Sequence, residues 1–265
     1  MSYITVAKKY TPKAVKQLVA RFRKLFVYYD YDSSQYWKKR ASDPDQAAVL
    51  WTNQAYNSLY RQDQQTTLEP YFKQLAPQAT VLDIGCGIGV VARMITQINP
   101  NLKVDAVDFP EMIAVAKTKN AETQINYIAC EAENYYREQQ PYAVILSSGC
   151  YSAIRDIKKL EQALQYASQM LAKDGLLIMI DPFHRWNYLA RAKYGSQDVI
   201  NYFASRGLVL EKKSGILFWP FREWLANSKH TGETLRKRYL LGEKLLAVLG
   251  KHFWADYKIL VFRKG

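Results

Sequence analysis

Residues 81–92 read VLDIGCGIGVVA: an apolar run ends in three alternating glycines, and a second apolar run follows. Gly85, Gly87 and Gly89 allow positive φ angles and let the backbone approach a ligand without a side-chain clash. In an open α/β sheet such a turn follows a strand at the edge where ligands bind. A dinucleotide fingerprint would need glycine in place of Val90, and the chain has no Gly-Lys-Ser/Thr run for a phosphate loop. The turn alone is weak evidence, but its spacing disfavours both of these sites.

Short β-rich runs alternate with helical windows on both sides of this turn. The predicted strands cover residues 79–84, 103–107, 125–129, 142–148, 175–181, 208–215 and 257–262. The predicted helices among them cover residues 89–98, 110–119, 132–138, 156–172 and 196–206. This alternation predicts an α/β fold with a seven-stranded, mostly parallel sheet and helices on both faces. We expect the last strand to run antiparallel beside residues 208–214.

Further helices are predicted outside this alternation. Thr11 and Pro12 suit the start of a helix, and apolar residues at three- and four-residue steps extend it to Phe26. A second helix is predicted over residues 46–74, and a third over about 231–249. We expect four parts: a helical N-terminal cap (1–70), a core (71–215), a cap or lid insertion (216–255) and a final core strand (256–265).

Composition excludes several classes of protein. The chain has 265 residues, 49% hydrophobic and 23% charged, which is typical of a globular protein. The longest central apolar run, 176–180, is too short to cross a bilayer, and the N-terminus lacks the pattern of a secretory signal. Cys86, Cys130 and Cys150 form no paired framework and lack zinc-site spacing. We therefore expect no metal site and a cytoplasmic location.

The net charge of +13 is concentrated at the two ends of the chain. Residues 1–45 hold ten Lys/Arg against four Asp/Glu, and residues 181–265 hold sixteen against seven. The middle, 46–180, holds eleven against thirteen. Such a distribution indicates a negatively charged partner for the ends, whereas a merely solubilising surface explains it equally well.

The glycine turn also carries a family resemblance. VLDIGCGIG (81–89) matches the pattern of two hydrophobic residues followed by Asp-x-Gly-x-Gly-x-Gly, and it resembles the class I S-adenosylmethionine-dependent methyltransferases. AVDFPEMIAVAK (106–117) is similar to the acid-ended second strand of that family and the helix after it. The resemblance covers about residues 70–215 and the last strand. It implies a Rossmann-like core that binds S-adenosylmethionine.

The resemblance also implies roles for single residues. Asp83 would face the amino-acid end of the cofactor, beside the glycines of the turn, and Asp108 would hold both ribose hydroxyls. A carboxylate suits a vicinal diol, because the diol offers two donors and the carboxylate two acceptors. Without the resemblance, Asp108 would equally well cap the following helix.

Two later segments extend the implied cofactor site. IACEAENY (128–135) resembles the segment after the third strand, which places Glu131 and Ala132 near the adenine, together with Phe109. Glu133 is an alternative to Glu131. AVILSSGCYSAI (143–154) resembles the fourth strand and the segment after it, so Ser147 and Ser148 would lie under the methionine part of the cofactor.

The acceptor is expected to bind outside the shared core, among the aromatic residues of 28–37, the loop after Asp181 and the 216–255 insertion. Aromatic walls and excess positive charge favour a small organic acceptor that is anionic or aromatic, with transfer to oxygen preferred over nitrogen or carbon. His184 is the leading candidate for a general base, since it follows the fifth predicted strand. Tyr31 and Tyr36 are further candidates for this catalytic role.

The sequence leaves other functions open. The basic ends would suit a nucleic-acid methyltransferase, but Ser147-Ser148-Gly149-Cys150 stands where enzymes that methylate exocyclic amines carry Asn/Asp-Pro-Pro-aromatic. A non-catalytic binding module is disfavoured by the intact glycines. The basic amphipathic helix over 12–26 could touch an anionic membrane, which we expect to be a minor role. The oligomeric state is not predicted.

Overall fold

The structure is a computed structural model, and it describes residues 34–43, 45–121, 124–139, 141–184 and 194–265. The predicted helix over 12–26 and the candidate base Tyr31 lie outside the described residues. Within the described residues, no helix combines the length and the apolar character needed to cross a bilayer.

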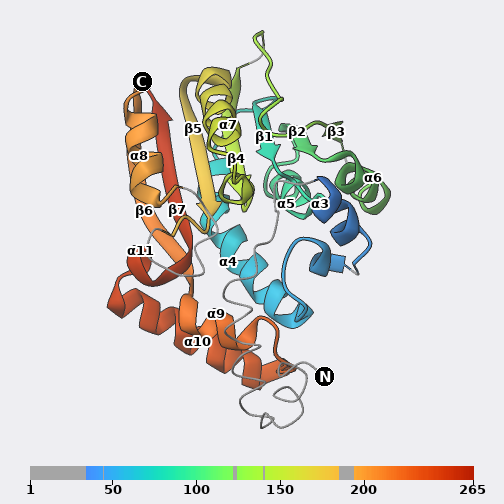
Figure 1. The fold of residues 1–265 in the computed structure, drawn as a ribbon, viewed down its shortest axis with the longest axis vertical. Coiled ribbons are helices and arrows are strands. Elements are labelled where there is room, and N and C mark those ends of the chain that lie inside the picture. Colours follow the sequence, from blue (N-terminus) through green and yellow to red (C-terminus); the bar gives the residue numbers. More distant parts are fainter. Residues whose placement is uncertain (1–33, 44, 122–123, 140, 185–193) are drawn as a thin grey trace, which may run out of the picture.

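A seven-stranded sheet forms the centre of the molecule, with the strand order β3-β2-β1-β4-β5-β7-β6 (Figure 1). Its strands are β1 (Thr80–Ile84), β2 (Lys103–Asp108), β3 (Ile125–Ala129), β4 (Tyr142–Ser148), β5 (Leu171–Asp181), β6 (Leu208–Phe218) and β7 (Ala255–Lys264). The pairs among β1 to β5 are parallel, and β7 runs antiparallel to both β5 and β6. The predicted α/β sheet with its antiparallel last strand is confirmed.

Helices cover both faces of the sheet because its strands are apolar on both sides. On β1, Val81 belongs to one buried cluster and Leu82 to the other. The Val81 cluster includes residues of α4 (Gln54–Phe72), α5 (Val90–Ile98) and α6 (Pro110–Lys119). The Leu82 cluster includes residues of α7 (Ile157–Met170) and α8 (Ser196–Ala204).

The remaining elements lie at the edge of the sheet where the parallel strands end. On the N-terminal side they are α3 (Ser34–Ala41), which packs on α6, and the 3-10 helix η1 (Asp45–Ala48). A second 3-10 helix, η2 (Tyr151–Ala153), follows β4. On the C-terminal side they are α9 (Trp219–Leu225), α10 (Gly232–Leu249) and α11 (Lys251–Trp254), seen below the sheet in Figure 1.

Three predictions about individual elements were wrong. The helix predicted over 46–74 is divided into η1 and α4, and Asn53 between them caps α4 by accepting from the Tyr56 amide at 3.1 Å. The helix predicted over 132–138 is a turn followed by irregular chain. The insertion predicted to begin at residue 216 begins later, since β6 continues to Phe218 beside the first residues of β7.

Asn53 also joins the start of α4 to the loop between α9 and α10. Its side-chain amide donates to the carbonyls of Ser228 at 2.9 Å and His230 at 3.0 Å, in the loop between α9 and α10. Its backbone amide donates to the Ala226 carbonyl at 3.2 Å. Because Asn53 is buried, one side chain both starts α4 and holds this loop in place.

We expect Asn53→Ala to lower the free energy of unfolding by about 2–4 kcal/mol, since it removes a helix cap and leaves buried carbonyls without donors. Asn53→Ser is the matched control, because serine caps a helix but cannot donate to both carbonyls. It should lose about 1–2 kcal/mol. Urea denaturation followed by circular dichroism measures both losses, and equal stability of Asn53→Ser and the wild type would show that the side-chain contacts to the loop contribute nothing.

Candidate active site

A cavity of about 480 Å³ lies at the edge of the sheet where β1, β2 and β4 end. Eight of the predicted cofactor residues line it: Asp83, Gly85, Gly87, Asp108, Phe109, Glu131, Ala132 and Ser148. Tyr36 of α3 and residues 49–52 also line it, and so do Asn227 and Tyr257 from the C-terminal part of the chain. The cavity therefore joins the core to the elements around this edge.

The glycine turn is closely packed where it meets the cavity. Gly85 and Gly87 have φ angles of 73° and 58°. A Cβ atom at Gly85 would lie 2.3 Å from the Cβ of Cys150, and one at Gly87 would lie 2.6 Å from Cγ1 of Val49. Both positions thus exclude a side chain, by conformation and by space.

Gly89 and Ser147 are predicted cofactor residues that do not line the cavity. Gly89 precedes α5, and a Cβ there would lie 2.5 Å from the Tyr127 hydroxyl, so this glycine lets the helix pack closely on β3. Ser147 is buried and donates to Oδ2 of Asp181 at 2.8 Å. Its hydroxyl therefore links β4 to β5 rather than facing the cavity.

Asp108 ends β2 and holds the glycine turn against it. Oδ2 accepts from the Gly87 amide at 2.6 Å, and Oδ1 accepts from the Phe109 amide at 2.7 Å. Burial raises the pKa of Asp108 to about 6, although the two amides lower it. The carboxylate is thus oriented by the backbone and turned toward the cavity.

Asp83 is only 1% exposed, yet neither of its carboxylate oxygens has a hydrogen-bond partner among the described residues. Burial raises its pKa to about 7, and the negative charge of Asp108 adds to the increase, whereas the charge of Arg61 and the backbone amide of Ala92 lower it by less. A buried carboxylate without a partner is costly. Asp83 also lines the cavity, so a cationic or hydrogen-donating ligand there would supply the missing partner.

Arg61 is a cavity residue that the sequence pattern did not indicate. It lies on α4, and its guanidinium donates to Gln46 Oε1 at 3.1 Å and Gln64 Oε1 at 2.5 Å. Burial lowers its pKa, and it forms no ion pair with a carboxylate of the described residues. A partly buried guanidinium without a counter-ion among the described residues suits the carboxylate of a ligand.

Glu131 lines the cavity beyond β3, within the turn that replaces the predicted helix. Its Oε2 accepts from Asn134 Nδ2 at 3.2 Å and lies 3.8 Å from Nζ of Lys159. Glu133, the alternative, also lines the cavity but forms the closer ion pair with Lys159, at 2.6 Å. Burial and the charge of Glu133 raise the pKa of Glu131. Glu131 is therefore the less strongly paired of the two.

Three aromatic rings from distant parts of the chain form another wall of the cavity. Trp51, Tyr60 and Tyr257 lie with ring centroids 5.4 to 6.0 Å apart in every pairing. Burial raises the pKa of the Tyr60 hydroxyl to about 12, so it is protonated at neutral pH. These rings offer an apolar surface for a planar group, and the protonated hydroxyl can donate a hydrogen bond.

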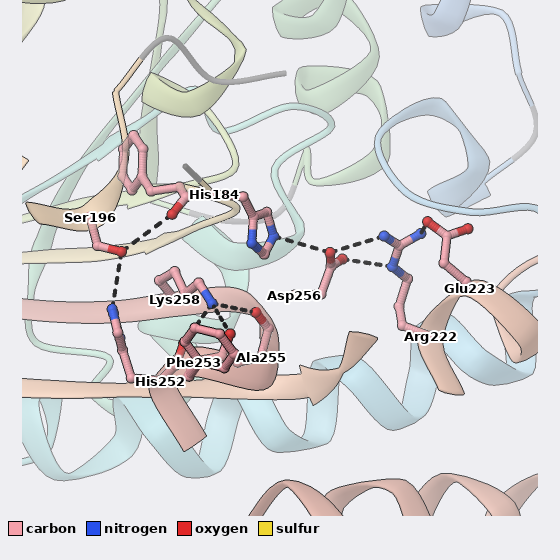
Figure 2. Close-up of polar contacts among 10 residues, drawn as sticks. His184, Ser196, Arg222, Glu223, His252, Phe253, Ala255, Asp256 and Lys258 are labelled. Atoms are coloured by element: carbon pink, nitrogen blue, oxygen red, sulfur yellow. Dashed lines mark hydrogen bonds and ion pairs between the residues drawn. The ribbon is translucent and has the colours of Figure 1, made fainter. Parts of the chain in front are cut away.

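His184, the predicted base, does not line the cavity. Its Nε2 lies 3.3 Å from Oδ1 of Asp256, whose Oδ2 lies 2.6 Å from Nε of Arg222 (Figure 2). Burial alone would raise the pKa of Asp256, but Arg222 and His184 hold it well below its usual range. His184 thus belongs to an ion-paired cluster at the start of β7. His230 and His252 do not line the cavity either.

Comparison with known proteins supports the interpretation of these residues. The family model for a methyltransferase domain matches residues 81–175, the segment from β1 to the turn within β5 that contains Asp83, Gly85, Gly87, Asp108 and Glu131. The chain contains a class I S-adenosylmethionine-dependent methyltransferase domain. S-adenosylmethionine is the cofactor of this family. The described residues hold no cluster of His, Cys, Asp and Glu suited to a metal ion.

Curated relatives of this domain act on different acceptors. A malonyl-[acyl-carrier protein] O-methyltransferase of Bacillus cereus is 32% identical over 99 residues, which cover 37% of this chain and 35% of that protein. A tRNA1(Val) (adenine(37)-N6)-methyltransferase of Pedobacter heparinus is 32% identical over 137 residues, which cover 44% of this chain and 58% of that protein. The chain thus spans about a third of the first relative and just over half of the second.

Solved methyltransferase structures share the fold over most of the chain. The N-methyltransferase NodS from Bradyrhizobium japonicum, in complex with S-adenosyl-L-homocysteine, matches with a TM-score of 0.58 and 14% identity, covering 87% of this chain and 97% of that one. Magnesium protoporphyrin IX methyltransferase from Synechocystis matches with a TM-score of 0.55 and 12% identity, covering 89% and 93%. At such identities the likeness concerns the fold alone.

We expect Asp83→Asn to raise the free energy of unfolding of the ligand-free protein at pH 8 by about 1–3 kcal/mol, because it removes a buried charge without a partner. Since the folded pKa lies above the usual value, the penalty from the charge is complete above pH 7 and disappears as the pH falls toward 4. The gain should therefore shrink between pH 8 and pH 5. Urea denaturation at both pH values measures it.

Asp181→Asn is the matched control, because Asp181 is equally buried but accepts from Ser147 and from the hydroxyl and amide of Ser152. Burial also raises the pKa of Asp181, so removal of its charge offsets part of the lost hydrogen bonding, and we expect a smaller gain than for Asp83→Asn or a net loss. An equal or larger gain in Asp181→Asn would contradict the description of Asp83 as the carboxylate with fewer partners.

Proposed function

We propose that the chain transfers a methyl group from S-adenosylmethionine to a small organic acceptor bound in the cavity at this edge of the sheet. The observation that supports this most directly is that the glycine turn, Asp83 and Asp108 line the same cavity as Trp51, Tyr60 and Tyr257. The first group lies within the methyltransferase domain match, and the aromatic residues lie outside it.

The residues present fit the cofactor. In our proposal Asp108 accepts from both ribose hydroxyls, and Phe109, Glu131 and Ala132 surround the adenine. Asp83 then meets the cofactor's ammonium group, which gives the buried carboxylate its missing partner. Arg61 meets the carboxylate at the same end of the cofactor, and its attraction to Asp83 agrees with such an arrangement of opposite charges.

When bound, S-adenosylmethionine supplies an activated methyl group, so the protein has to align the acceptor and exclude water. In our proposal the rings of Trp51, Tyr60 and Tyr257 hold the acceptor, and Tyr36 covers it from α3. The protonated Tyr60 hydroxyl orients the acceptor by donating a hydrogen bond. His184 contacts Asp256 instead of the cavity, so the proposal assigns no proton transfer to it.

We favour transfer to an oxygen of an aromatic or anionic acceptor. The aromatic wall supports a planar group, and O-methyltransferases occur among the relatives. The tRNA methyltransferase relatives and the basic ends favour a nucleic-acid acceptor as the second candidate. Against it, Ser147 and Ser148 end β4 where a base-methylating enzyme would carry its proline-rich loop, and Ser147 is bonded to Asp181.

The test of the proposed function is a screen with trideuteromethyl-labelled cofactor and phenol, carboxylic acid, amine and tRNA acceptors, with mass detection of the product. We expect a labelled small-molecule product, and a Tyr60→Phe variant should turn over about 10- to 100-fold more slowly with unchanged cofactor affinity. A product on tRNA alone, formed with a steep salt dependence, would replace this proposal by the second candidate.

Asp108→Ala should weaken S-adenosylhomocysteine binding roughly 30- to 150-fold, the equivalent of about 2–3 kcal/mol, because two ribose hydroxyls lose charged acceptors. Asp105→Ala is the control, because Asp105 lies on the same strand but pairs with Arg137 and does not line the cavity. Its affinity should stay within about twofold of the wild type. Calorimetry that shows equal affinity for both variants would refute the placement of the ribose.

Cofactor affinity should also fall as the pH falls. Asp83 and Asp108 have pKa values raised to about 7 and 6, and both must be ionised to accept the ammonium and ribose groups. Between pH 8 and pH 5.5 the competent fraction drops, so the Kd of S-adenosylhomocysteine should rise about tenfold or more. Calorimetry at both pH values, with circular dichroism to verify folding, measures the change, and a constant Kd would contradict it.

A further inference from the structure

The helix α10 and the adjoining α11 carry a set of exposed apolar side chains. We call this set the C-terminal apolar face, and its members are Leu241, Leu245, Val248, Leu249, Phe253 and Trp254. Val248 is 84% exposed and Phe253 is 74% exposed. Soluble proteins rarely gather so many large apolar side chains on one exposed surface, and such surfaces usually mark an interaction site.

The face is a consequence of how α10 packs. Leu235, Tyr239 and Leu246 are buried, and they occupy the side of the helix that meets α4, α9 and β6. At 3.6 residues per turn, Leu241 and Val248 lie on the opposite side. The helix is therefore apolar on two sides, and only one of them is covered by the described residues.

Lysines share the uncovered side. Lys237 and Lys244 fall on the same helical face as Leu241 and Val248, and Lys251 begins α11; all three are exposed, although the charge of Lys251 also acts on Asp63 and Glu243. Lys237 lies 3.8 Å from Glu233, whereas Lys244 and Lys251 form no ion pair with the described residues. The acidic residue in the middle of α10, Glu243, is turned inward and accepts from the Phe218 amide at 3.0 Å.

We propose that the C-terminal apolar face rests on an anionic lipid bilayer surface. Leucine, phenylalanine and tryptophan side chains enter the headgroup boundary, while lysines beside them attract anionic lipids. The N-terminal segment is a poor partner for this face, because residues 1–33 carry seven Lys/Arg against two Asp/Glu and would be repelled by the lysines. A second copy of the chain would bring the same lysines together. An anionic bilayer surface can bury the apolar side chains and also attract the lysines.

Vesicle co-sedimentation of the full chain tests this proposal. We expect binding to mixed phosphatidylglycerol and phosphatidylcholine vesicles, little binding to phosphatidylcholine alone, and a loss of binding at about 0.5 M salt. The double variant Val248→Ser, Phe253→Ser should reduce the partition coefficient at least about tenfold. Val209→Ser is the control, because Val209 is 64% exposed on β6, outside this face, and should bind as the wild type does.

Light scattering on the same samples distinguishes binding to vesicles from association of two copies of the chain. Absence of vesicle binding, or binding that the double variant leaves unchanged, would overturn the proposal. A wild-type dimer that the double variant converts to a monomer, without vesicle binding, would show that the face joins two copies. The fold of both variants can be verified by circular dichroism, since neither changes a buried residue.

Discussion

Two carboxylates, Asp83 and Asp108, are held close together at the buried ends of adjacent parallel strands, and the site is arranged around that constraint. In the register of β1 against β2, Asp83 pairs with Ala106, two residues before Asp108, and burial raises the pKa of both carboxylates. Asp108 is satisfied by two backbone amides, whereas Asp83 has no partner among the described residues. The free protein therefore stores an unfavourable charge arrangement that a ligand with an ammonium group and a diol would relieve.

The rest of the cavity is built by parts of the chain that lie outside the domain match. Trp51 and Tyr60 come from the segment before β1, and Tyr257 comes from β7, yet their rings pack together. Asn53 holds these two regions to each other through the loop after α9. In our account the core, together with Arg61 of α4, thus binds the cofactor, and the added elements determine the acceptor.

The core was predictable because its signals are local. A glycine turn after an apolar strand, and an acidic residue at the end of the next strand, identify the edge where ligands bind. Arg61 was missed because a basic residue in a helix is ordinarily solvated, and its burial depends on packing that no local pattern reports. His184 does follow β5 as expected, but Asp256, far along the chain, pairs with it outside the cavity. A helix was predicted over 132–138, where a turn follows Glu131, because local composition does not show that these residues line a cavity.

The most direct test of the central claim is a crystal structure of the full chain with S-adenosylhomocysteine. Our account predicts that the ribose hydroxyls lie within hydrogen-bond distance of Asp108 and that the amino-acid end lies between Asp83 and Arg61. The sulfur should then face the rings of Trp51, Tyr60 and Tyr257. A ligand bound elsewhere, or with its amino-acid end away from Asp83, would contradict the account.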